Sequence, residues 1–275
     1  MSLRINTNLA SINAQRQLAS QESRSLNSMK SLASGSRINS AADDAAGLAI
    51  SENLKAQNRG NRMAKRNAED AISFIQVGEG SLNEVNNILV RLRELSVQSA
   101  SDTVGDTERE FIDQEREQLV NEIDRIAEST KFNDKFLLNG TLDELEFQIG
   151  TDSSESSIIR YNSQADATSG SLGVSGLDLT DKSSARSALE DLDDAIDQVG
   201  NMRANFGALQ NRLDSTIANL DTSYESMSAA NSRIRDADIA AESAEFTSAQ
   251  ILQQASIGML AQANQSKAAA LSLLG

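Results

Sequence analysis

The chain has 275 residues, contains no Cys, His, Pro or Trp, and carries a formal net charge of −15. Without Cys or His it cannot form a thiolate nucleophile, a Ser-His-Asp triad or the usual zinc sites. We therefore expect no enzyme activity and no catalytic, metal or cofactor-binding residues. The acidic balance argues against nucleic acid as the main partner. No apolar run approaches the ~20 residues of a membrane span, so we expect no membrane insertion.

The composition favours long helices. Pro costs about 3 kcal/mol in a helix interior, and it is absent throughout. Aromatic residues make up only 3% of the chain, so the core must come from Leu, Ile, Val and Ala, as in thin helical bundles. The start, residues 1–8, has no apolar h-region, so we expect no cleaved secretory signal.

The first predicted helix covers about residues 8–32 and carries a narrow apolar seam. Apolar residues recur there every seven positions, which is typical of a coiled coil. The seven-residue series is Ile5, Ile12, Ala19, Leu26 and Ala33, with Leu9 and Met29 beside it.

Two further helices are predicted over about residues 56–99 and 107–129. One apolar face of the first of them contains Ile72, Ile75, Leu82, Val85, Leu89 and Leu92. The second opens on Thr107-Glu-Arg-Glu110, which matches a capping box. The residues Ile112, Leu119, Ile123 and Ile126 then follow at helical spacing.

The pattern changes at Phe132. Two short apolar runs, 136–138 and 145–149, flank Asn139-Gly140. Asn-Gly is a common hairpin turn, because both residues tolerate positive φ, so we predict a β-hairpin or short sheet. Residues 151–183 are rich in Ser, Gly, Asp and Thr and predict a surface loop with short strands.

The fourth predicted helix has the clearest periodicity. From Leu189 to Met227 the apolar residues alternate steps of three and four. Ser187 and Glu190 match a capping box at its start. About forty residues at 1.5 Å each give a rod of ~60 Å, which needs partner helices to cover its apolar stripe.

The fifth predicted helix covers about residues 240–274 and carries a second narrow stripe, in which only Lys267 is charged beyond Phe246. A thin isolated helix is marginal in water, so a seam at each end of the chain indicates packing between the two ends and self-assembly. The predicted polymerisation seam consists of Ile5, Leu9, Ile12, Leu26, Leu252, Met259, Ala263 and Leu274.

Long blocks at both ends carry a resemblance to the bacterial flagellins, which covers about residues 1–150 and 184–275. The N-terminal blocks are LASGSRINSAADDAAGLAIS at 32–51, RELSVQSA at 93–100 and NEID at 121–124. The C-terminal blocks are SRIRDADIAAE at 232–242, QILQQA at 250–255, MLAQANQ at 259–265 and LSLL at 271–274.

This resemblance implies a mainly α fold. Both chain ends would form a long antiparallel helical rod or coiled coil, with a small β-hairpin region and no large inserted outer domains. Residues 1–44 and 236–275 would form the inner core of a filament. Residues 45–235 would form the surrounding rod domain, with the hairpin and loop region at about 131–183. The implied function is a structural subunit of the bacterial flagellar filament used for swimming.

The resemblance also implies partners. They are other copies of the chain, a flagellar export chaperone at the C-terminal helix, and hook-associated and cap proteins. Type III export would place the protein outside the cell, in the flagellum. In flagellins that activate a host Toll-like receptor, four rod residues form the contact, and the matching positions here are Arg91, Leu95, Gln98 and Glu115. The same residues would also serve assembly.

Two alternatives stay open at this point. A hook–filament junction protein shares the terminal design, although the length and the block at 233–242 favour a filament subunit. A soluble helical binding module is the alternative from another class, and the acidic charge and narrow Ala-rich seams argue against it.

Overall fold

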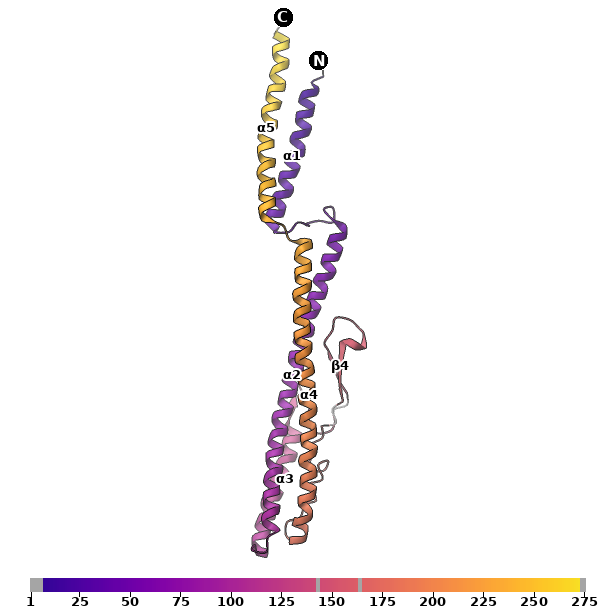
Figure 1. The fold of residues 1–275 in the computed structure, drawn as a ribbon, viewed down its shortest axis with the longest axis vertical. Helices are drawn as coiled ribbons and strands as arrows, with labels where there is room; N and C mark the ends of the chain where they lie inside the picture. The colour runs from indigo at the N-terminus through magenta and orange to yellow at the C-terminus, as the bar shows by residue number, and fades with distance from the viewer. Residues whose placement is uncertain (1–6, 142–143, 163–164, 273–275) are drawn as a thin grey trace. The chain divides into compact units, whose positions relative to one another are not determined.

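The computed structural model describes residues 7–141, 144–162 and 165–272, and long helices dominate it (Figure 1). The helices are α1 (Leu9–Ser34), α2 (Ala45–Ser99), α3 (Asp106–Ser129), α4 (Lys182–Arg235) and α5 (Ile239–Ser272). A short 3-10 turn, η1 (Glu155–Ser157), and four short strands lie between α3 and α4. The chain forms two compact units: a terminal unit of residues 1–58 with 225–275, and a central unit of residues 59–224.

In the terminal unit, α1 and α5 lie side by side and run antiparallel, as the indigo and yellow ribbons of Figure 1 show. At one end of the pair, Asn8 caps α1 by accepting from the Ser11 N–H, and its Nδ2 donates to the Ala263 carbonyl at 3.1 Å. At the other end, Ser36 and Asp236 form an antiparallel β-bridge. Contacts at both ends therefore fix the register of the pair.

Gly35 ends α1 in the left-handed conformation, with φ at 68°, as is common for a glycine that follows a helix. Its carbonyl accepts from the Ala237 N–H at 2.9 Å, and the Arg37 N–H donates to the Arg235 carbonyl at 2.7 Å. Both chain segments that leave the α1/α5 pair are thus hydrogen-bonded to each other.

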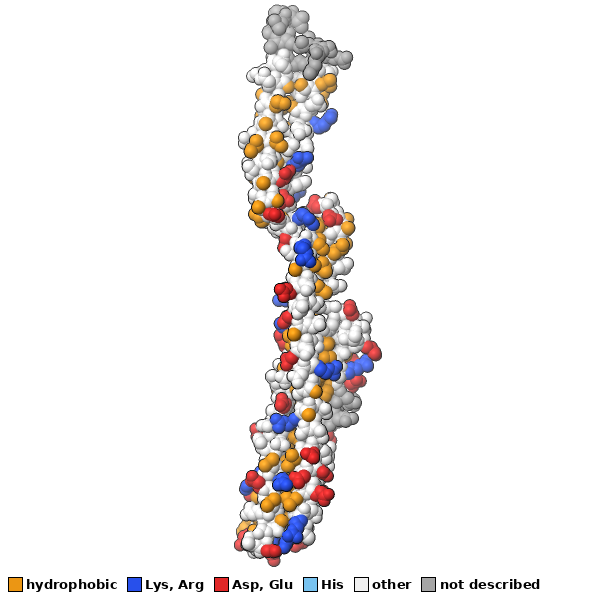
Figure 2. Space-filling model, viewed as in Figure 1, with side chains coloured by type: hydrophobic (Ala, Val, Ile, Leu, Met, Phe, Trp, Pro, Cys, Tyr) orange, Lys and Arg blue, Asp and Glu red, His pale blue; other side chains and the backbone are white. Residues whose placement is uncertain are grey.

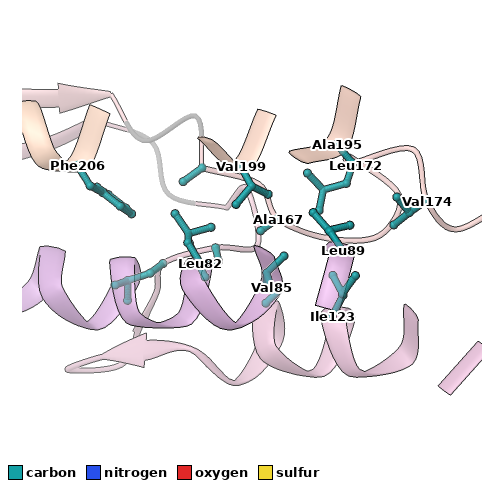
Figure 3. Close-up of a cluster of buried hydrophobic side chains, with 14 of the residues drawn as sticks. Leu82, Val85, Leu89, Ile123, Ala167, Leu172, Val174, Ala195, Val199 and Phe206 are labelled. Atoms are coloured by element: carbon teal, nitrogen blue, oxygen red, sulfur yellow. The ribbon is translucent and has the colours of Figure 1, made fainter. Parts of the chain in front are cut away.

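The central unit is built around α2, α3 and α4. The ion pairs Lys65–Asp221 and Arg93–Asp193 show that α2 and α4 are antiparallel. Figure 3 shows Leu82, Val85 and Leu89 of α2 facing Ile123 of α3 and Val199 and Phe206 of α4. The three- and four-residue spacing of apolar residues that predicts these helices also supplies their buried faces.

Two helices extend further than predicted, and neither predicted capping box forms. The second helix begins at Ala45 rather than near residue 56, because the Asp44 carboxylate accepts from the Gly47 N–H and caps it. The cap of α3 is Gly105, with no side-chain hydrogen bond, so Thr107 is inside the helix. The fourth helix begins at Lys182, and Ser187 is an interior residue whose hydroxyl donates to the Ser183 carbonyl.

The β region is confirmed as a small hairpin region, but the predicted turn is wrong. The first hairpin pairs β1 (Lys131–Phe132) with β2 (Lys135–Phe136), and its turn residues Asn133 and Asp134 have positive φ. The second pairs β3 (Glu144–Gln148) with β4 (Ile158–Asn162), in the register Leu145–Tyr161. The run at 136–138 therefore does not pair with 145–149 across Asn139-Gly140.

The predicted surface loop is partly a core element. Segment 165–179 contributes six buried apolar side chains, listed here: Ala165, Ala167, Leu172, Val174, Leu177 and Leu179. The Asp124 carboxylate holds the segment against α3 by accepting from the Ser169 N–H and hydroxyl. Single apolar residues set among Ser, Gly and Thr give no periodic signal, so the sequence pattern did not reveal this packing.

Candidate assembly surface

The contact between α1 and α5 is made by a face rich in small and polar residues, here called the inner face. Its members are buried or half-buried and follow one another in steps of three and four. On α1 they are Ser11, Ala14, Leu18, Gln21, Ser25, Ser28 and Leu32, and on α5 they are Glu242, Phe246, Ala249, Gln253, Ser256, Leu260 and Ala263.

Most of the large apolar residues of the two helices lie instead on exposed surfaces, here called the outer faces. On α1 these are Leu9, Ile12, Leu26 and Met29, and on α5 they are Ile239, Ile251, Leu252, Ile257 and Met259. Met259 is 69% exposed. In Figure 2, orange side chains recur along the visible face of this pair, while blue and red ones are sparse. Exposed apolar patches of this kind mark interaction surfaces.

The predicted polymerisation seam divides between these faces. Leu9, Ile12, Leu26, Leu252 and Met259 lie on the outer faces. Ala263 lies on the inner face, where its carbonyl accepts from Asn8. Ile5 and Leu274 lie outside the described residues.

The seven-residue apolar series is therefore not the contact between α1 and α5. Sequence reasoning missed the inner face because Ser and Gln occupy it. The only available signal is a second heptad series, in a different phase, that runs through Ser11, Leu18, Ser25 and Leu32.

The predicted site on α2 and α3 is brought together only in part. The Arg91 guanidinium lies between two carboxylates, 2.8 Å from Glu115 Oε1 on α3 and 3.0 Å from Glu94 Oε2. Its hydrogen bonds to Glu115, which has the larger effect, and to Glu94 raise the pKa of Arg91 above its ordinary range. Gln98 is exposed on the same helix. The structure thus brings Glu115 of α3 alongside Arg91 of α2.

Leu95 is a correction to that site. It was expected on the exposed face with Arg91, but it is only 1% exposed and belongs to the core. Both α3 and α4 pack on α2, which widens the buried face of α2 to include Leu95 as well as Leu92. Exposed apolar residues at this end of the central unit include Val90, Val97 and Phe111. The exposure of Phe111 could have been expected, because it directly precedes the core residue Ile112 and adjacent residues of a helix point about 100° apart.

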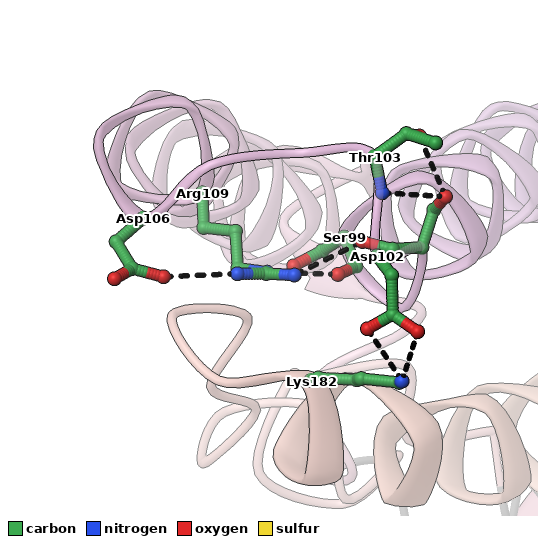
Figure 4. A network of polar contacts seen from close by, with 7 residues as sticks. Ser99, Asp102, Thr103, Asp106, Arg109 and Lys182 are labelled. Atoms are coloured by element: carbon green, nitrogen blue, oxygen red, sulfur yellow. Dashed lines mark hydrogen bonds and ion pairs between the residues drawn. The ribbon is translucent and has the colours of Figure 1, made fainter.

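A polar network fixes the turn that joins α2 and α3 (Figure 4). The nearly buried Arg109 donates to the carbonyls of Ser99 and Ser101, each at 3.0 Å, and pairs with Asp106. Its guanidinium thus satisfies carbonyls at the end of α2 that have no helical partner. Lys182 at the start of α4 pairs with Asp102 of the turn. These contacts hold α3 against α2 where Arg91 meets Glu115.

The described helices include none with both the length and the hydropathy to cross a membrane.

Comparison with known proteins covers nearly the whole chain. The family described as bacterial flagellin N-terminal helical region matches residues 5–143, and the bacterial flagellin C-terminal helical region matches residues 189–274. A flagellin of Halalkalibacterium halodurans is 45% identical over 98% of this chain and 99% of its own length. A flagellin of Bacillus subtilis is 42% identical over 99% and 100%, respectively.

Solved structures agree with this relationship. A crystal structure of Bacillus cereus flagellin is 34% identical, covers 56% of this chain and 88% of its own, and superposes with a TM-score of 0.50. A structure described as a flagellar hook-associated protein from Vibrio parahaemolyticus reaches 0.59 at 14% identity, which shows only a shared fold. The paired terminal helices, the absence of a large inserted domain among the described residues, and the end-to-end sequence match place this chain in the bacterial flagellin family, whose members are structural subunits of the flagellar filament.

Proposed function

We propose that this chain polymerises through the outer faces of α1 and α5, and that its role is structural rather than enzymatic. One observation carries the proposal: most of the large apolar side chains of both terminal helices are exposed rather than turned to the contact between them. Burial of apolar surface contributes about 25 cal/mol per Å². In the α1/α5 pair, the apolar side chains of the outer faces stay exposed to solvent. Contact between the outer faces of neighbouring copies would bury them.

In the proposed filament, residues 1–44 and 236–275 form the inner core and residues 45–235 the surrounding layer. The inner face buries too few large apolar groups to offset the entropy of ordering two helices. We therefore propose that α1 and α5 are mostly unpaired in the dilute monomer and pair on assembly.

Single charges on the outer faces test the proposal. Leu26→Asp or Met259→Asp should keep the full chain in the supernatant on centrifugation under conditions where wild type pellets, because a carboxylate would be buried between copies. Asn27→Asp adds the same charge next to Leu26 at an exposed position off the apolar series and should still pellet. Normal polymer from both outer-face variants would contradict the proposal.

Other partners follow from the same surface. We infer that the flagellar export chaperone covers the exposed apolar residues of α5 before export, and that cap and hook-associated proteins meet the outer faces at the filament ends. Export through the type III apparatus would place the polymer outside the cell. Ile251, Leu252 and Met259 are exposed in the single chain, which supports the proposal that a chaperone covers them before assembly.

A second proposed role is recognition by a host Toll-like receptor. The observation that favours it is the ion pair between Arg91 and Glu115, which places two of the four implied contact residues side by side on different helices. With Leu95 buried, the accessible contact would consist of Arg91, Gln98 and Glu115, with Val97 and Phe111 as exposed apolar neighbours.

A further inference from the structure

Gln21 differs from the other inner-face residues in the way its polar group is buried. Its side chain is 3% exposed, and its Oε1 has no hydrogen-bond partner among the described residues. Ser256, buried on the facing helix, donates its hydroxyl to the Leu252 carbonyl at 2.8 Å. A buried amide oxygen without a donor destabilises the contact that buries it, whereas an apolar side chain of similar size does not.

The register of the pair places Gln21 near its middle. Fraying of the helix ends therefore does not expose Gln21 to water. The contacts Asn8–Ala263 and Ser36–Asp236 lie at opposite ends of the pair. Counting inward from either contact puts Gln21 level with the α5 turn that contains Ala249 and Gln253, near the middle of the contact. Helix ends fray at low cost, but a central position opens only when the pair separates.

We infer that Gln21 sets the strength of α1/α5 pairing and so couples that pairing to assembly. The coupling rests on the proposed polymerisation through the outer faces. A polar residue at one position of the buried contact between two helices lowers the stability of the pair. If the assembly-competent state is the paired one, the apparent affinity of a monomer for the filament end equals its intrinsic affinity multiplied by the paired fraction. Gln21 therefore keeps free chains from assembling at low concentration.

Gln21→Leu in the full chain tests the first half of the inference. The exchange should raise the pairing equilibrium constant by roughly 5- to 30-fold. In dilute solution, protease should therefore cut within α1 and α5 more slowly than in wild type, because cleavage follows the population of the open form. Gln17→Leu is the matched control: the same exchange at an exposed position of α1 should leave the cutting rate unchanged. Gln21→Ala removes the unpartnered oxygen without adding apolar bulk and should slow cutting by a smaller factor.

The critical concentration for polymerisation tests the second half. For Gln21→Leu it should fall, by at most the same roughly 5- to 30-fold by which the pairing equilibrium constant rises, because assembly follows the paired fraction. For Gln17→Leu it should not change. Wild-type cutting rates in both Gln21 variants would overturn the inference. Protection without a lower critical concentration would overturn the coupling. A wild-type chain that never polymerises would refute the proposed function instead, while the protease result would still decide the role of Gln21 in pairing.

Discussion

At the scale of single residues, Asp113 shows how one carboxylate joins two elements of the central unit. Its oxygens accept from the Arg116 guanidinium at 2.6 and 2.9 Å, and one of them also accepts from the Leu179 N–H at 3.1 Å. The hydrogen bond with Arg116, opposed by burial, lowers the pKa of Asp113 below its ordinary value of 3.8. The charged form therefore stabilises the link between α3 and the segment that leads into α4.

This depressed pKa predicts a pH dependence of stability. A carboxylate with a lowered folded-state pKa contributes stability that is present above its unfolded value and is lost as pH falls through its folded value. The urea unfolding free energy of wild type should therefore fall more steeply than that of Asp113→Asn between roughly pH 4 and pH 2. Equal slopes for the two proteins would contradict the assignment. Glu128→Gln, at an exposed position of α3, serves as the control.

Arg91 gives a second residue-scale prediction, for the receptor role. Arg91→Ala should weaken receptor activation by the monomer by roughly tenfold or more, since Arg is favoured among dominant interface residues. Arg59→Ala changes an exposed arginine of the same helix that has no ion pair among the described residues, and it should stay near wild type. A reporter assay on monomeric protein, with helicity measured in parallel, checks this. If wild type is silent, the receptor role fails and only the assembly role remains.

At the scale of elements, the close approach of α4 to α2 depends on a residue without a side chain. A Cβ added at Gly78 would lie 3.0 Å from the ring of Phe206 and 3.3 Å from Leu137. Two residues further along, Gly80 faces open space. The two glycines share one helix but have opposite surroundings.

Substitution by alanine should separate them. Gly78→Ala should lower the free energy of unfolding by about 1 kcal/mol or more, because overpacking outweighs the gain in helix propensity. Gly80→Ala should raise it by about 0.5–1 kcal/mol, because it restricts the unfolded chain without a clash. Urea denaturation followed by circular dichroism measures both. Stabilisation by Gly78→Ala would show that Phe206 moves aside freely.

Prediction from sequence succeeded where packing follows a single period. The stripe from Leu189 to Met227 predicts α4, because one continuous apolar face leaves only one way to bury it. Prediction from sequence failed where two different packing arrangements satisfy the same residue pattern. The β3 strand could pair with an earlier or a later segment, and only tertiary packing selects β4. On α1, two heptad series compete, and counting apolar residues selects the outer one, which holds Leu26, over the inner one, which holds Gln21.

At the scale of the whole molecule, the two units predict separable behaviour. Deletion of residues 1–35 or 245–275 removes much of the α1/α5 pair but touches no residue of the central unit, residues 59–224. Neither truncated chain should pellet under conditions where the full chain polymerises. Both should keep the thermal transition of the central unit, measured by circular dichroism. Filaments from either truncation would refute the requirement for both ends, and loss of the transition would show that the units are not independent.

The contact between Asn8 and Ala263 has a consequence for the order of folding, since it joins residues 255 positions apart. Helix formation is local and takes about 0.1–1 μs. Contacts between distant residues must wait until the chain between them has closed a loop. During synthesis, α1 emerges long before α5 and has no partner in its own chain. We therefore expect pairing of the two ends to be the last folding step, because it needs both the first and the last helix of the chain.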